Sequence, residues 1–266
     1  MGFMSMSVKL MGIPGPKLPQ DEKFTQDLFG TSVPTFVSPD TRANAQLQHW
    51  SPKNAQLFYF LNFREPHVLD GVMNLLWTKT QTSPLESQYF SCVPYLLGEG
   101  KAMQYSFWSR LDTRTPVPRV PRRPRDNYLR DAMVATLAKQ DVEFDVLLQV
   151  QTDPFLMPIE NSAVMWPVAL SPRVPAAVVK IPTQTFDSPE QIAFGSVLSY
   201  NPWHCIPEHR PLGNVSRARR PLYVELSELR QKMNGVQHYE PTGDEVFPGF
   251  TVPDRPAQDQ GQRVTD

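Results

Sequence analysis

The sequence predicts an α+β fold in which antiparallel strands and helices pack around one core. Two patterns carry this prediction. In some segments apolar and polar residues alternate, as in half-buried strands, and in others apolar residues recur every three or four positions, as on one face of a helix. The third observation is the content of 28 prolines in 266 residues. So many fixed turns argue against a regular helical bundle.

The first half of the chain is expected to contain hairpins and one helix. Each element follows from the periodicity of its apolar residues and from the glycines beside it. The expected elements are a half-buried strand at 3–11, a short strand at 33–38, a helix at 65–79, and a hairpin formed by 87–97 and 101–111 around Gly98 and Gly100.

The second half is expected to contain two helices and two strands. They are a helix at 126–140 with Asp126 as its N-cap, strands at 142–153 and 175–182, and a helix at 220–233 with Pro221 near its first position, where proline is tolerated. Residues 236–266 are polar and proline-rich with little periodicity. We expect them to form a disordered or loosely docked tail after a domain of residues 1–235.

Composition excludes several classes of function. The formal net charge of −1 gives no bulk electrostatic argument for a nucleic acid or a membrane surface as partner. No apolar run is long enough to span a bilayer, and no secretory signal is evident. The two cysteines, Cys92 and Cys205, form neither a disulfide framework nor a CxxC metal site. We therefore expect a soluble intracellular protein of the cytoplasm, without a nucleic-acid or membrane partner.

Two polar segments have competing interpretations. The proline–arginine run at 110–125 resembles an extended ligand for nucleic acid or an SH3-type domain, but it lacks interleaved aromatic residues, so a solvated connector is favoured. The segment HCIPEH (204–209) gathers two histidines, a cysteine and a glutamate. Its histidines are five residues apart and do not share a helix face. Cys205 is in principle a thiolate ligand for haem, yet a loop with polar caps is favoured over a metal site.

The segment ARRPLYVELSELR (218–230) is more informative. Arg219 precedes Tyr223 by four residues, and Arg230 follows it by seven, which places Arg230 on the same helix face as the tyrosine. A nearby guanidinium stabilises a phenolate, and tyrosine is one of the known axial ligands of haem iron. A second arginine on that face suits a haem propionate. Without further support, an ordinary surface helix is favoured.

That support comes from four segments that occur in a particular order. They are SVKLMGIPGPKLPQDEKFTQDLFGTSVPTFV, SPLESQYFSCVPYLLGEGKAMQYSF, LLQVQTDPFLMPIENSAVMWPVALSP and SYNPWHCIPEHRPLGNVSRARRPLY. Together they resemble the haem catalase superfamily, and in particular its small catalase-like members. The resemblance covers about residues 2–232, and its most specific parts are NPWHCIPEHRPLGNVSRARR and PIENSAVMWP. It implies an antiparallel β-barrel core with packed helices, haem b as cofactor and a homo-oligomer.

The resemblance also assigns roles to residues of this chain. It implies that Tyr223 is the axial ligand of the haem iron, that Arg219 stabilises its phenolate, and that Arg230 meets a haem propionate. The family's distal histidine lies upstream of the segment matched by residues 3–11, and no histidine precedes His49 in this chain. We therefore expect an N-terminally shortened barrel, with an unpaired edge that a partner subunit covers.

The distal side is where this chain departs from the family. In GTSVP (30–34), Ser32 stands where the family has an amide side chain. A serine donates one hydrogen bond but does not replace a histidine as general base. Ser32, Thr31, His49 and His67 are the candidates for the distal role.

The resemblance implies a haem-binding oxidoreductase that acts on hydrogen peroxide or organic hydroperoxides, in specialised metabolism. Without a distal base we expect its catalase activity to be weak or altered. The alternative is a non-catalytic relic of the fold that acts as an interaction or regulatory protein.

Overall fold

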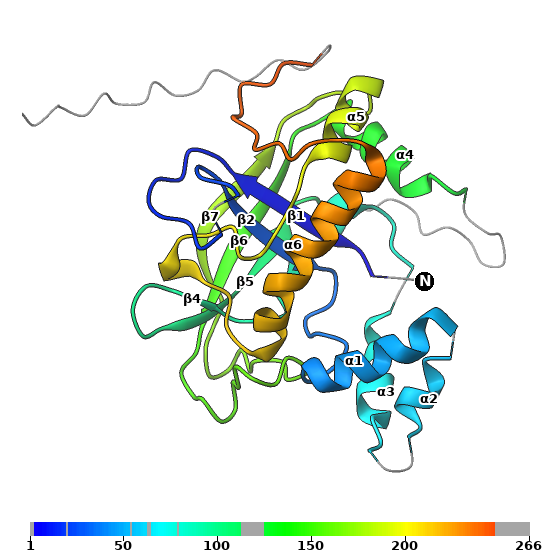
Figure 1. Ribbon diagram of the computed structural model, residues 1–266, viewed down its shortest axis with the longest axis vertical. Helices are drawn as coiled ribbons and strands as arrows, with labels where there is room; N and C mark the ends of the chain where they lie inside the picture. The colour runs from blue at the N-terminus through cyan, green and yellow to red at the C-terminus, as the bar shows by residue number, and fades with distance from the viewer. Residues whose placement is uncertain are drawn as a thin grey trace, which may run out of the picture.

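One antiparallel sheet forms the centre of the molecule in a computed structural model (Figure 1). The structure describes residues 3–19, 21–53, 55–62, 65–78, 80–112 and 125–247. The strands run in the order β1-β2-β3-β5-β6-β7, and β4 pairs with β5. Their bounds are β1 Ser5–Leu10, β2 Gln26–Thr31, β3 Tyr89–Phe90, β4 Tyr95–Leu96, β5 Ala102–Ser109, β6 Val142–Val150 and β7 Val174–Ile181.

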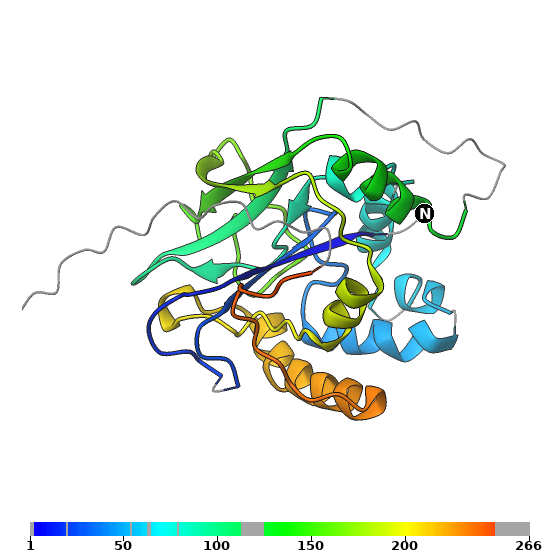
Figure 2. The ribbon, with the colours of Figure 1, turned by 90° about the horizontal axis from the view of Figure 1, so that it is seen from above.

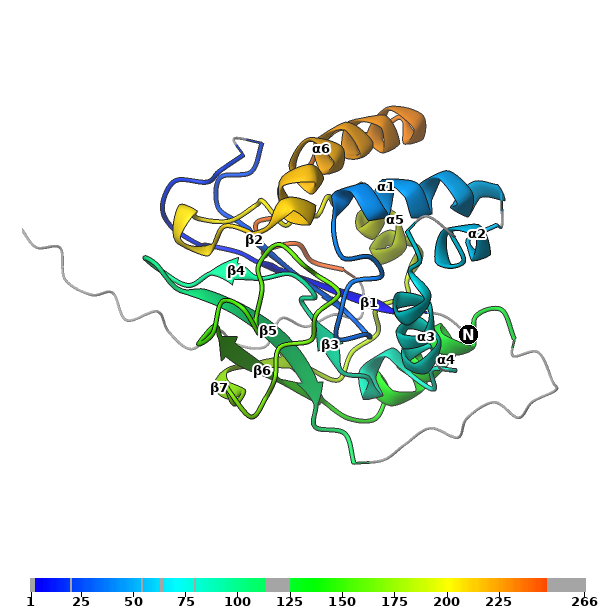
Figure 3. The same cartoon turned by 90° about the horizontal axis from the view of Figure 1, so that it is seen from below.

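Helices lie around this sheet. They are α1 Thr41–Trp50, α2 Leu57–Phe60, α3 Val68–Trp77, α4 Tyr128–Leu137, α5 Pro189–Val197 and α6 Asn214–Asn234. The long helix α6 lies at the outer edge of the molecule in both turned views, on the side of β1 and β2 (Figures 2 and 3). Within the described ranges, no helix is both long and apolar enough to cross a bilayer.

The sheet curls around an apolar core. Alternate residues of β6 point inward, so that Val142 and Phe144 are almost fully buried. Met6 and Val8 of β1 pack against the same core, while Ser7, between them, faces the other side. Each large apolar side chain buried in this way contributes about 1.5–3 kcal/mol relative to an exposed one. The buried members of the core are Leu85, Tyr89, Val93, Tyr95, Met103, Tyr105, Phe107, Leu137, Val142, Phe144, Val146 and Val215.

The α+β class and the antiparallel barrel-type core predicted from the sequence are confirmed. The strands expected at 3–11, 142–153 and 175–182 form β1, β6 and β7, and the helices expected at 65–79 and 126–140 form α3 and α4. Across the described strands the curled sheet is a half-barrel, because its path begins at β1 and ends at β7.

Two predicted elements are wrong in position. Residues 33–38 form bends, and the strand in this part of the chain is β2, which precedes them. Both faces of β2 are covered, so it shows no alternation that would identify it. The helix expected at 220–233 begins at Asn214, which places Pro221 inside it.

The beginnings of the helices also differ in detail. Asn127 rather than Asp126 precedes α4 as its N-cap residue. Helices α1, α2 and α5 were not predicted, although α5 has a capping box in which Ser188 and Gln191 bond reciprocally.

Gly30 of β2 provides a test of how closely the sheet is packed. A Cβ atom on this residue would lie 2.7 Å from Cβ of Tyr89 and 3.3 Å from Cδ2 of Phe107. We expect Gly30→Ala to lower the free energy of unfolding by about 1–3 kcal/mol, the usual cost of overpacking. Urea unfolding would measure it. The matched control is Gly195→Ala in α5, where a Cβ would meet nothing within 4 Å. An unfolding midpoint for Gly30→Ala equal to that of the parent would contradict this packing.

Candidate functional site

Helix α6 places both Arg219 and Tyr223 on its half-covered side. Its first turn is held by Glu160, which accepts hydrogen bonds from the backbone N–H of Asn214 at 2.7 Å and from the guanidinium of Arg217 at 2.9 and 3.0 Å. The helix continues through Pro221, so Arg219 and Tyr223 lie one turn apart. The helix predicted at 220–233 therefore begins earlier than expected, and the Glu160 contacts hold its first turn.

Tyr223 packs on the outer face of β2. Its half-buried ring meets Phe29 edge-on, with the ring centroids 6.0 Å apart. Phe29 is itself fixed, because its backbone N–H donates to the hydroxyl of Tyr105 at 2.8 Å. Tyr200 meets the same phenylalanine at 6.4 Å. The sheet thus sets the position of the Tyr223 ring.

The guanidinium of Arg219 also faces the sheet. Its Cζ atom lies 4.9 Å from the centroid of the Phe36 ring. Burial raises the pKa of the Cys92 thiol to about 11 and that of the Tyr95 hydroxyl to about 12. At both groups the positive charge of Arg219 acts in the opposite direction and lowers the pKa. The arginine therefore brings a positive charge to the side of α6 on which Tyr223 lies.

Arg230 has partners within the chain. Its guanidinium donates to the carbonyl oxygen of Leu198 at 2.6 Å and to that of Ser196 at 3.4 Å, and the side chain is exposed. These carbonyls belong to the C-terminal end of α5, where a cation is favoured by the helix dipole. Arg230 thus fastens the second half of α6 to α5.

Ser32 also has internal partners. Its hydroxyl accepts from the backbone N–H of Met4 at 2.9 Å and from Nε2 of Gln81 at 3.4 Å. The residue lines a cavity of about 700 Å³ whose lining includes neither Arg219 nor Tyr223. The structure therefore does not bring Ser32 into one cavity with the two residues of α6.

The other candidates for a distal role contact different neighbours. His49 is on α1 with Nε2 3.1 Å from Nζ of Lys53, and His67 stacks on Tyr59 with ring centroids 4.4 Å apart. Thr31 donates to the carbonyl oxygen of Val33. Most of the predicted proline–arginine connector, residues 113–124, lies outside the described residues.

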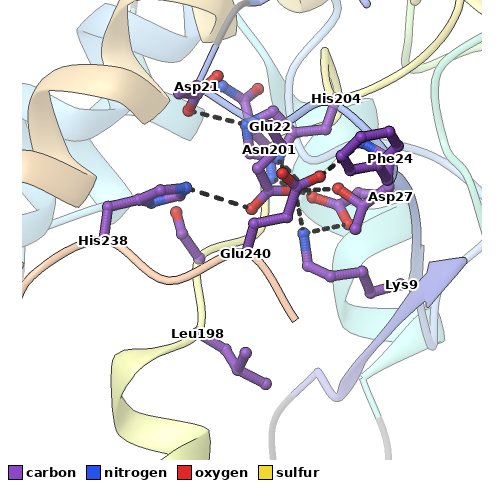
Figure 4. A network of polar contacts seen from close by, with 12 residues as sticks. Lys9, Asp21, Glu22, Phe24, Asp27, Leu198, Asn201, His204, His238 and Glu240 are labelled. Carbon is purple, nitrogen blue, oxygen red and sulfur yellow. Dashed lines mark hydrogen bonds and ion pairs between the residues drawn. The ribbon is translucent and has the colours of Figure 1, made fainter. Parts of the chain in front are cut away.

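A buried ionic network was not foreseen from the sequence (Figure 4). The ammonium of Lys9 lies 2.5 Å from Glu22 and 2.8 Å from Asp27. Nδ1 of His204 lies 2.8 Å from Asp27 and 3.1 Å from Glu22, and its Nε2 lies 3.0 Å from Asp21. Apart from Asp21, these side chains are at most 4% exposed. The network joins β1 and β2 to the segment before α6.

The same network attaches the segment that follows α6. Nε2 of His238 lies 3.7 Å from Glu22. The carboxylate of Glu240 accepts from the backbone N–H groups of Lys23 and Phe24 at 2.7 and 2.6 Å (Figure 4). Residues 236–247 thus contact the domain, whereas the rest of the expected tail, 248–266, is outside the described residues.

The charges in this network compensate one another. Burial alone would lower the pKa of His204, but its hydrogen bonds to Asp21, Asp27 and Glu22 outweigh burial and raise it to about 11. Burial would raise the pKa of Glu22, and the hydrogen bonds from His204 and Lys9 lower it instead. The histidine is therefore an imidazolium between carboxylates.

Glu22, Asp27 and His204 have ligand atoms close enough together to hold a metal ion. Both ring nitrogens of His204 are already engaged, however, Nδ1 with Asp27 and Nε2 with Asp21. Lys9 and His204 each pair with both Glu22 and Asp27, so two cations face the two buried carboxylates. Within the HCIPEH segment, Cys205 is buried and His209 pairs with Gln26, so these side chains do not join this group. We interpret the group as an ion-pair network that supports the fold.

Stability should depend on pH through this network. The stabilisation from the raised pKa of His204 is complete below about 6.5, the unfolded value, and is lost as pH rises toward 11. The stabilisation from the lowered pKa of Glu22 is present above its ordinary value of 4.5 and is lost as pH falls. The free energy of unfolding should therefore be greatest between about pH 4.5 and 6.5.

The variant His204→Gln should lose about 3–5 kcal/mol near pH 6, because buried carboxylates are left without their cation. Its stability should also fall less between pH 7 and 10 than that of the parent. Urea unfolding across this pH range measures both effects, with His49→Gln as the exposed control. Parallel pH profiles for the parent and His204→Gln would refute the assignment.

Some solved structures are similar to this architecture. No protein-family model and no curated protein matches the sequence. A fungal catalase is similar with a TM-score of 0.60 and 16% sequence identity, and the match covers 77% of this chain and 45% of the catalase. A bacterial catalase has a TM-score of 0.56 and 13% identity, with 92% of this chain and 54% of the catalase covered. Catalase A from Saccharomyces cerevisiae has a TM-score of 0.62 and 13% identity, with 91% of this chain and 59% of the catalase covered.

The chain thus spans 45–59% of the length of these catalases. Identities of 13–16% establish likeness of fold and not of activity. The curled antiparallel sheet with its surrounding helices is a catalase-like fold.

Proposed function

We propose that residues 1–235 form a haem-binding domain in which Tyr223 is the ligand of the iron of haem b. The observation that carries the proposal is the pair on α6. Arg219 and Tyr223 lie one turn apart on the side of the helix that contacts the sheet, in a fold shared with catalases. A tyrosine oxygen beside a fixed positive charge suits ferric iron.

The residues around this pair fit a planar apolar group. Phe29 and Phe36 provide aromatic surface beside Tyr223 and Arg219 respectively. Tyr223 would supply the anionic oxygen ligand, and Arg219 would hold its charge. Phe36 keeps the guanidinium in place through a cation–π contact. Arg230 does not fit the role of a propionate partner in this arrangement, because its guanidinium is bonded to α5. Bound haem would supply the redox chemistry by which peroxides are reduced.

The second part of the proposal concerns activity. We propose that hydrogen peroxide or organic hydroperoxides are the substrates, with weak or altered catalase activity. Reduction of a peroxide requires a positioned base that moves a proton between its oxygens. Ser32 is no such base, and its hydroxyl is bonded to Met4 and Gln81. His49 and His67 lie against other neighbours.

A non-catalytic role is the second candidate function. The observation that favours it is the engagement of Ser32 and Arg230 in contacts within the chain, so that two of the four residues assigned by the resemblance are occupied. In this case the domain would bind haem weakly or not at all and act as an interaction or regulatory subunit.

The ligand assignment is tested by hemin titration of the purified chain and of Tyr223→Phe. The parent should give the absorption spectrum of a five-coordinate ferric tyrosinate. Loss of the phenolate oxygen should abolish this spectrum and weaken hemin binding by about tenfold or more, which corresponds to about 1.4 kcal/mol. The control is Tyr200→Phe, because Tyr200 meets the ring of Phe29 as well. Identical spectra for the parent and Tyr223→Phe would exclude Tyr223 as the ligand, and no binding by the parent would favour the non-catalytic role.

The role of Arg219 is tested by a second pair of variants. We expect Arg219→Leu to raise the dissociation constant for hemin by about tenfold, because a charge next to an anionic ligand contributes about one pKa unit or more. Arg219→Lys should restore part of the loss. Arg220→Leu is the control, since its guanidinium lies over Trp203 instead, 5.1 Å from the ring centroid. Equal hemin affinities of Arg219→Leu and Arg220→Leu would contradict the role.

A further inference from the structure

Helix α6 carries an apolar stripe on its exposed side. Leu222, Leu226, Leu229 and Met233 are 51, 53, 52 and 77% exposed. The steps of four, three and four residues between them match the a and d positions of a heptad repeat, which form a continuous seam along one side of a helix. The helix lies in front of the sheet in Figure 1 and at the outer edge of the molecule in the two turned views (Figures 2 and 3). Four large apolar side chains in one line on a surface helix indicate a binding surface.

The charges beside this stripe indicate what it binds. Glu225 and Lys232 are seven residues apart and occupy the flanking g positions of the repeat. Both are exposed, and neither has an ion-pair partner within the part of the chain that the structure describes. Residues seven apart on one helix are too distant to pair with each other. The stripe is thus flanked by a negative charge followed by a positive charge. A partner helix that presents a positive charge opposite Glu225 and a negative charge opposite Lys232 would complement it.

We propose that the stripe binds the same stripe of a second copy of this chain, with the two α6 helices antiparallel across a two-fold axis. Leu226 then lies opposite the partner's Leu229, and Leu222 lies opposite the partner's Met233. Glu225 lies beside the partner's Lys232. Because the interface is two-fold symmetric, each of these contacts forms twice.

A parallel arrangement is less favourable for a reason visible in the structure. It would place Glu225 beside the partner's Arg230, at the e position of the next heptad. Arg230 already donates to the carbonyl oxygens of Leu198 and Ser196 in its own chain. The antiparallel arrangement uses Lys232 instead and leaves the link between α6 and α5 intact.

The expected dimer is weak. From residue 222 to residue 233 the stripe spans about 17 Å at 1.5 Å per residue. A helix pair of that length buries less surface than the ~1,600 Å² of a standard stable interface, so we expect a dissociation constant of about micromolar size. The inference does not rest on haem binding, because no residue of the stripe is among the contacts of Tyr223 and Arg219 with Phe29 and Phe36.

Sedimentation of the full chain without hemin, over a concentration series through the micromolar range, tests the proposal. We expect a monomer–dimer equilibrium, and a dissociation constant raised by about 100-fold in Leu226→Glu/Leu229→Glu, because the seam would then bury charge. Phe155→Glu is the control, since Phe155 is 88% exposed and lies outside α6. Circular dichroism checks that each variant is folded. A parent that stays monomeric, or a dimer unaffected by the double variant, would overturn the proposal.

Charge exchange tests the pairing itself. Glu225→Lys and Lys232→Glu should each weaken the dimer by about tenfold, since like charges then meet, while the double exchange should return the affinity to within about threefold of the parent. A double exchange no better than either single variant would overturn the antiparallel pairing. So would a disulfide formed between two copies of Met233→Cys, because the antiparallel pair separates these positions by about 17 Å along the helices. A monomer destabilised by Leu226→Glu would mean that the chain covers the stripe itself, and would also overturn the proposal.

Discussion

The buried network around His204 is the constraint on which the position of the candidate site depends. It joins Lys9 of β1 and Asp27 of β2 to the segment that enters α6, and through His238 to the segment that leaves it. Trp203, next to His204, donates from Nε1 to the carbonyl oxygen of Ser216 in the first turn of α6. Because buried carboxylates are stable only when fully paired, these segments are held in one arrangement. That arrangement sets Tyr223 against Phe29.

The sequence predicted the parts of the fold whose causes are local. Alternation identified β1 and β6, since each has one face in the core, but it missed β2, whose outer face is also covered. Asp27 was not recognised as buried because its partner His204 lies 177 residues away. One local signal was overlooked, namely the serine, proline and glutamine of the α5 capping box.

The candidate site also has one part that could be predicted from local sequence and one part that could not. Arg219 and Tyr223 were predictable as a pair because four residues on a helix always make one turn. The surroundings of Ser32 and Arg230 were not, because their partners Met4 and Leu198 lie 28 and 32 residues away. A family resemblance transfers a residue to a position, but only the packing determines whether its hydrogen bonds are free.

Helix α6 carries two proposed sets of contacts, which use different side chains. Glu160 anchors its first turn, and Arg230 ties its second half to α5. The position of the helix therefore does not depend on contacts of its exposed stripe. Hemin binding and self-association therefore report on different residues of the same helix. A negative result for one leaves the argument for the other unchanged, since no contact cited for Tyr223 involves Leu226 or Leu229.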